Sequence, residues 1–86
     1  MIEENIIEVG SILHFFAKIN VAVVELSTSL SVGDQILVKG PQTDFEQVVE
    51  SMQIEHENLQ KAEKGQSIGL KMIQHAKEKD MVYKKL

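Results

Sequence analysis

The stretch that says most about the fold runs from Ser51 to Met72 and reads SMQIEHENLQKAEKGQSIGLKM. Near its start, Met52 and Ile54 flank Gln53, and near its end apolar residues alternate with small or charged ones over residues 67–72. Alternation with a period of two places one set of side chains on one face of a strand. The stretch therefore predicts two short strands joined by a polar connection.

The rest of the chain shows the same organisation. Short runs rich in Val, Ile, Leu and Phe lie between breaks such as residues 31–34 and 40–42. Such spacing predicts an all-β fold, a small antiparallel β-barrel of about six or seven strands, closed or nearly closed. With 86 residues, the chain has room for one core, so residues 1–86 are expected to form a single domain. The predicted core consists of Val23, Ile36, Val38, Met52, Ile54, Ile68, Leu70 and Val82.

Two strands have predicted faces. In residues 8–16, strict alternation puts His14 and Phe16 on the face of Ile12, and Phe15 on the other. Residues 21–26 are almost wholly apolar, which is typical of a strand covered on both sides.

One segment carries helical signals. Glu57 and Lys61 have i,i+4 spacing, and Gly65 follows where a helix could end with positive φ. Because residues 57–64 are too few for an independent helix, they predict a single helical turn between strands.

Composition excludes several classes of protein. The chain is 43% apolar and 26% charged, as expected of a globular domain, and it has no cysteine for disulfides or thiolate metal sites. The longest stretch without Lys, Asp or Glu is residues 9–17, whereas a membrane helix needs about twenty residues. The first residues are acidic, unlike a signal peptide. A cytoplasmic protein with no membrane partner is expected.

Charge is unevenly distributed. Residues 1–70 hold four lysines and eleven acidic residues, and residues 71–86 hold five lysines, Glu78 and Asp80. Arginine is absent, which counts against a dedicated nucleic-acid surface because its fork is favoured for phosphate. The lysine-rich end is interpreted as a solvated tail.

Gly65-Gln66-Ser67-Ile68-Gly69 fits the G-x-S-x-G pattern of serine hydrolases. That chemistry requires a strand, a sharp turn that exposes the serine, and then a helix. Here Ser67 leads directly into an alternating strand, so the match is interpreted as coincidence. Gly65 is assigned to a turn with positive φ, and Gly69 to a close approach of two backbones.

No other pattern supports catalysis. On a strand, His56 would point away from Glu55 and Glu57, so the three could not bind one metal ion. His14 lies in an apolar run and is interpreted as a structural histidine. No glycine is followed by lysine, so a phosphate-binding loop is excluded. We expect neither an enzyme by itself nor a cofactor or metal.

Several of these motifs together resemble a known family. SVGDQILVKG, residues 31–40, and the Gly-polar-polar-apolar-Gly-apolar segment of residues 65–70 resemble the second domain of the translational GTPases, the β-barrel of elongation factor Tu. KDMVYKK, residues 79–85, resembles the strand that ends that barrel. The whole looks like a stand-alone elongation-factor-like protein. Related barrels also serve as appended domains of collagenase-like peptidases.

The resemblance implies a binding or adaptor module that docks on a protein partner, with translation-associated RNA binding as the alternative. The oligomeric state stays open. The candidate partner-binding residues are the outward aromatic of the first strand, Phe15 or Phe16, together with Phe45, His56 and Lys71. His56 is the nearest match to a basic residue with which the factor's barrel helps hold tRNA. Phe45 has two alternatives, a surface contact or a cap on the barrel core.

Overall fold

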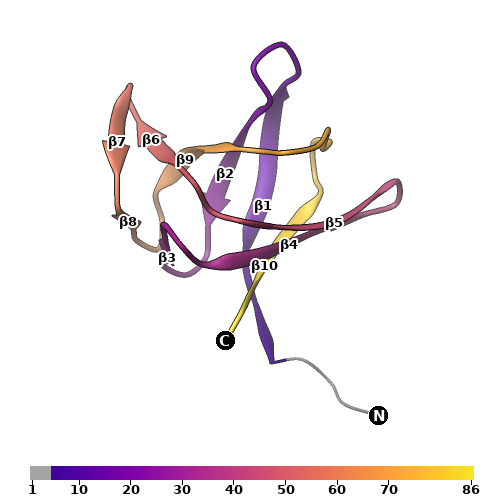
Figure 1. Cartoon of the computed structure of the whole chain (residues 1–86), viewed down its shortest axis with the longest axis horizontal. Helices are drawn as coiled ribbons and strands as arrows, with labels where there is room; N and C mark the ends of the chain where they lie inside the picture. Colours follow the sequence, from indigo (N-terminus) through magenta and orange to yellow (C-terminus); the bar gives the residue numbers. More distant parts are fainter. Residues whose placement is uncertain (1–4) are drawn as a thin grey trace.

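The computed structural model describes residues 5–86, which contain strands and turns but no helix (Figure 1). The all-β prediction is confirmed. No helix in this described part of the chain is long and apolar enough to cross a membrane. The ten strands are β1 (Ile6–Phe16), β2 (Val21–Leu26), β3 (Leu30–Ser31), β4 (Gln35–Gly40), β5 (Thr43–Val48), β6 (Met52–Ile54), β7 (Glu57–Leu59), β8 (Lys61–Ala62), β9 (Ser67–Lys71) and β10 (Met81–Lys85).

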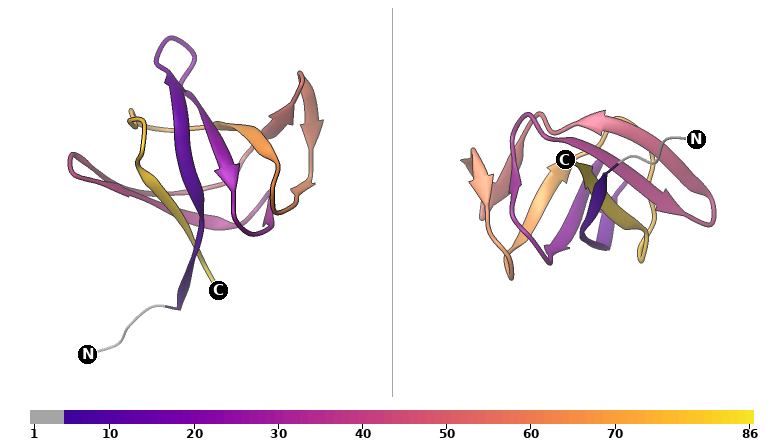
Figure 2. Two further views of the ribbon diagram at one scale, coloured as in Figure 1. Left: turned by 180° about the vertical axis from the view of Figure 1, so that it is seen from behind. Right: turned by 90° about the horizontal axis from the view of Figure 1, so that it is seen from below.

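Eight strands form one sheet in the order β5-β4-β10-β1-β2-β9-β6-β7, and β3 and β8 form a separate two-stranded ribbon. The pairings are antiparallel. The sheet curls around its core (Figures 1 and 2), but β5 and β7 remain as its two edges. The fold is thus a curled open sheet with more strands than the six or seven expected, because short segments such as β3, β7 and β8 also pair.

The buried glutamine Gln47 fastens one edge of this sheet. Its Nε2 donates to the carbonyl of Lys71 at 2.8 Å, and its Oε1 accepts from the N–H of Ile73 at 2.8 Å. Lys71 is the last residue of β9 and Ile73 follows it, so side-chain bonds hold β5 against the end of β9 without a strand ladder.

The core lies on the concave side of the sheet. Of the eight predicted core residues, six are fully buried: Ile36, Val38, Met52, Ile68, Leu70 and Val82. Ile54 is partly buried and packs against them. Val23 was placed wrongly, because β2 is buried on one face only: Ala22, Val24 and Leu26 enter the core. The expectation that β2 is covered on both sides is therefore wrong as well.

Two irregularities in β1 give its side chains different faces from those predicted. The register shifts between Glu8 and Gly10 in the pairing with β10, and between Ile12 and His14 in the pairing with β2. An extra residue in one strand moves the following side chains to the opposite face. Ile12 is therefore buried while His14 and Phe16 are exposed, contrary to their predicted common face.

The predicted helical turn over residues 57–64 is also wrong. β7 and β8 occupy most of this segment, and a tight connection of Glu55 and His56 joins β6 to β7. The i,i+4 charge spacing does not produce a helix here, because a short isolated helix is unstable in water and these residues pair as strands instead. The positive φ predicted for Gly65 is confirmed at 91°.

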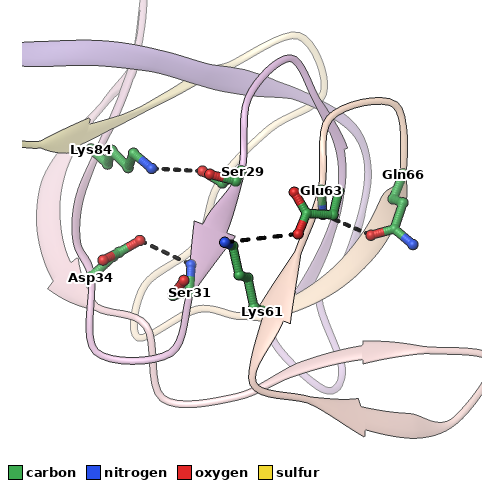
Figure 3. A network of polar contacts seen from close by, with 7 residues as sticks. All are labelled: Ser29, Ser31, Asp34, Lys61, Glu63, Gln66 and Lys84. Carbon is green, nitrogen blue, oxygen red and sulfur yellow. Dashed lines mark hydrogen bonds and ion pairs between the residues drawn. The ribbon is translucent and has the colours of Figure 1, made fainter.

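Polar contacts fix the β3–β8 ribbon and involve the lysine-rich end (Figure 3). Lys84 donates from Nζ to the Ser29 carbonyl at 2.7 Å, and the Asp34 carboxylate accepts from the Ser31 N–H at 2.9 Å. Lys85, also on β10, pairs with Glu46 at 3.1 Å. The interpretation of residues 71–86 as a solvated tail is wrong here, because β10 lies in the middle of the sheet between β4 and β1.

Candidate functional site

The outer face of the sheet carries a hollow of about 290 Å³ that we call the outer hollow. It is lined by Phe16, Ile19, Val21, Val23, Gln53, Glu55, His56 and Gly69. Its base follows from strand alternation: Val21 and Val23 face outward from β2 because their neighbours enter the core. Gly69 on β9 pairs with both Val23 and Gln53, and its missing side chain leaves the base of the hollow open.

The connection between β1 and β2 forms one wall. Phe16 is 46% exposed and Ile19 is 56% exposed, so both present apolar surface to solvent. The ring of His14 packs edge-on against Phe16 with centroids 4.4 Å apart. Lys71 donates from Nζ to the Ile19 carbonyl at 2.7 Å, which ties this connection to β9. In Figure 1 the connection is the loop at the top of the view.

The turn between β6 and β7 forms the opposite wall. Glu55 and His56 are its two central residues, since Ile54 pairs with Glu57, and their φ values are 51° and 69°. A two-residue hairpin with positive φ at both positions favours Asn-Gly, because Asn adopts that backbone more readily than most residues and Gly has no Cβ to clash. Here a glutamate and a histidine occupy it, and both line the hollow.

The structure brings together three of the five candidate residues from the sequence. Phe16 and His56 line the outer hollow, and Lys71 flanks it through its bond to Ile19. His56 was expected on a strand, opposite to Glu55; instead both belong to the turn, because β6 ends at Ile54.

Phe15 and Phe45 lie elsewhere. Phe15 is partly buried, packs against the core and contacts the ring of His75 with centroids 4.7 Å apart. Phe45 is 7% exposed and belongs to the core. Of its two alternatives, burial in the core is therefore correct.

Six of the lining residues were not among the predicted site residues: Ile19, Val21, Val23, Gln53, Glu55 and Gly69. The alternation over β2 and β9 is visible in the sequence, but the pairing of Val23 with Gly69 is not. Gly69 was assigned to a close backbone approach, and this is wrong. A Cβ built there would meet only Val21 Cγ1 at 3.4 Å and the Gln53 carbonyl oxygen at 3.8 Å.

The hydrolase-like motif has no catalytic setting in the structure. Ser67 is exposed at the start of β9, where it pairs with Glu25, and a strand follows it. Among residues 5–86, no group of three or more His, Asp or Glu side chains could hold a metal ion. His14 Nδ1 lies 3.0 Å from Glu78 Oε2, with both side chains at least half exposed, which makes this pair a surface contact.

Comparison with known proteins relates the chain to peptidases. It is 42% identical over 78 residues to an uncharacterized protease of Methanocaldococcus jannaschii, covering 90% of this chain and 19% of that protein. It is 34% identical over 80 residues to a collagenase of Porphyromonas gingivalis, covering 91% of this chain and 19% of that protein. The chain thus spans about a fifth of the length of these relatives. No family model matches it.

The fold is that of a domain already seen in crystals. The C-terminal domain of a Geobacillus thermoleovorans protein described as a U32 peptidase superposes with a TM-score of 0.83 at 23% identity. The superposition covers 88% of this chain and 96% of that domain. Its likeness therefore extends over nearly all of both chains.

These findings correct the resemblance to translation factors. The relatives are named as a protease and collagenases, and the structural neighbour is a domain of a U32 peptidase. The glycines and turn residues of residues 31–40 and 65–70 meet backbone requirements that small curled β domains share. They therefore do not distinguish one family of such domains from another. The prediction of an elongation-factor-like adaptor, with translation-associated RNA binding as its alternative, is therefore wrong.

Proposed function

We propose that this chain is an accessory β domain of a collagenase-like peptidase, and that it holds polypeptide substrate while a separate catalytic domain cleaves it. The observation that carries the proposal is the coverage of the sequence match. Nine-tenths of this chain corresponds to one-fifth of a protease. A module that matches so completely within a longer enzyme contributes one part of its activity.

The described side chains support a role in binding rather than in bond cleavage. Among residues 5–86, no hydrogen bond joins the Ser67 side chain to a base, and Ser67 leads straight into β9, whereas a nucleophile needs a base and an orienting group within hydrogen-bonding reach. The outer hollow, by contrast, presents the exposed apolar side chains of Phe16 and Ile19, with Glu55 and His56 on its other wall. Apolar surface with a few polar groups at its edge is typical of a recognition site. The absence of cysteine fits action in the reducing cytoplasm.

A domain exchange tests this function. In the P. gingivalis collagenase, the segment that matches this chain is deleted, or replaced by residues 1–86, and cleavage of fluorescent gelatin is measured. We expect deletion to lower kcat/KM by about tenfold or more, mainly by raising KM, because lost substrate binding remote from the reacting bond reduces productive capture. The chimera should recover most of that loss.

An unrelated β domain of similar size, inserted at the same place, is the control for a mere linker effect. It should behave like the deletion. The proposal is wrong if this control restores cleavage as well as residues 1–86 do. It is also wrong if the isolated chain cleaves gelatin and loses that activity in Ser67→Ala.

A further inference from the structure

The geometry points to the outer hollow as a subsite for one large apolar side chain of an extended polypeptide, with an adjacent lysine or arginine of that polypeptide meeting Glu55. This inference rests on the proposed function and names the segment of substrate that the domain recognises. Four features of the hollow carry it: its size, its open base, its charge and the backbone of its wall.

Size selects the kind of ligand. The hollow has a volume of about 290 Å³, at the lower end of the range of roughly 300–1,000 Å³ typical of sites for cofactors and drug-sized molecules. Phe16, Ile19, Val21 and Val23 give it apolar walls and base. A single aromatic or branched aliphatic side chain suits this volume and lining better than a whole nucleotide or cofactor does.

The base of the hollow is open although packing does not require it. A methyl group on Gly69 would make ordinary van der Waals contact with Val21 and would clash with nothing. Gly10 is different, since a Cβ there would lie 2.0 Å from the Glu25 carbonyl oxygen. The glycine at position 69 therefore leaves space for something outside the fold.

Charge selects the neighbouring residue of the ligand. Among the described residues that line the hollow, Glu55 supplies the one carboxylate, and no lysine lines it. The nearby ammonium group of Lys71 donates to the Ile19 carbonyl. A carboxylate at the edge of an apolar hollow attracts a cationic side chain and repels a phosphate backbone. A basic polypeptide segment therefore fits better than a nucleic acid.

The wall is built at a conformational cost. Glu55 and His56 both adopt positive φ, at 51° and 69°, where Asn-Gly would be more stable. Strained backbone of this kind concentrates at binding sites, where the side chains present matter more than local stability. The two strained residues are the two that the turn presents to the hollow.

Peptide titration of the 15N-labelled chain tests the inference. The probes are blocked hexapeptides with the sequences Gly-Gly-Phe-Lys-Gly-Gly, Gly-Gly-Phe-Glu-Gly-Gly and Gly-Gly-Ala-Lys-Gly-Gly. We expect the Phe-Lys peptide to shift the amide signals of Phe16, Val23, His56 and Gly69, and to bind more tightly than the other two. Gly69→Ala should weaken its binding about tenfold or more, because the added methyl occupies the base. Glu55→Gln should reduce the preference for Phe-Lys over Phe-Glu by about two- to fivefold.

Val48→Ala is the matched control, since Val48 is an exposed apolar residue on β5, outside the hollow, and its loss should leave binding unchanged. The inference is overturned if the peptide shifts signals elsewhere, or if Gly69→Ala binds it normally while folded. It is also overturned if a single-stranded oligonucleotide shifts these signals and the peptides do not. The peptide titration and the gelatin assay test the subsite and the proposed function separately. If the chimera restores cleavage but the chain does not bind the peptide, only the subsite is wrong. If the chain binds the peptide but the chimera does not restore cleavage, the proposed function is wrong.

Discussion

The side chain of Gln47 holds the backbone of Lys71 at 2.8 Å from across an open edge of the sheet. The same amide accepts the N–H of Ile73 at 2.8 Å. One buried side chain thus joins the edge strand β5 to the end of β9, a strand with which β5 shares no ladder. Lys71 in turn holds the connection that forms one wall of the outer hollow, through its bond to Ile19. We therefore expect the shape of the candidate site to depend on the two bonds of Gln47.

Gln47→Ala should lower the free energy of unfolding by about 2–3 kcal/mol, because two backbone groups lose their partner in a partly buried place. Urea denaturation measures the change, and faster amide hydrogen exchange at Ile73 locates it. Gln74→Ala is the control, because Gln74 is exposed and its loss should change stability by less than about 0.5 kcal/mol. Equal stability of the two variants would show that Gln47 does not hold β5 against the end of β9.

Two glycine positions should respond oppositely to the same substitution. Gly10→Ala places a methyl against the Glu25 carbonyl and should cost about 2–3 kcal/mol, because the obstacle is backbone and cannot rotate away. Gly69→Ala should change stability by less than about 1 kcal/mol, since its methyl meets only ordinary contacts. Thermal melting of both variants provides the comparison. A larger loss for Gly69→Ala would mean that the hollow is filled by the fold itself.

Ile68 and Val23 offer a similar test of the two faces of the sheet. Ile68 is 1% exposed, and Ile68→Ala should cost about 2–5 kcal/mol. Val23 lines the outer hollow and is only partly buried, so Val23→Ala should cost less than about 1 kcal/mol. Chemical denaturation that ranks Val23→Ala as the more harmful substitution would place β2 with both faces covered.

Much of the core could be predicted from the sequence, because alternation with a period of two fixes which side chains share a face. Ile36 and Val38, like Ile68 and Leu70, are buried as that rule requires. Alternation failed where an extra residue interrupted it. The bulge between Ile12 and His14 leaves no mark in the apolar pattern, since strand formers such as Ile12 and Phe15 lie on both sides of it.

The candidate site could be predicted only in part. Phe16 and His56 stood out as an aromatic and a basic residue in unusual places, and both line the hollow. Val23 and Gly69 could not be found this way, because the space between them exists only when β2 and β9 pair in one register. A glycine in a strand has several explanations, and only its neighbours in space distinguish an open base from a tight packing contact.

Replacing Glu55-His56 by Asn-Gly should make the chain more stable and less able to bind. Relief of the positive φ at both positions should add about 1–2 kcal/mol and raise Tm by roughly 5–10 °C. Binding of the Phe-Lys peptide should weaken at the same time, because both side chains that the turn presents to the hollow are lost. Replacement by Ala-Ala is the control: it removes the same side chains without easing the backbone, so binding should fall with no gain in Tm. A turn variant that binds the peptide as tightly as the original chain would show that the turn takes no part in recognition.

The measurement closest to the central claim is the KM for fluorescent gelatin of the P. gingivalis collagenase chimera carrying Gly69→Ala. If the outer hollow holds substrate, this methyl should raise KM about tenfold while kcat stays within roughly twofold, because it removes binding remote from the reacting bond. Val48→Ala in the same chimera should leave both constants unchanged, since Val48 lies on β5 outside the hollow. An unchanged KM for Gly69→Ala in a fully folded, active chimera would contradict the account.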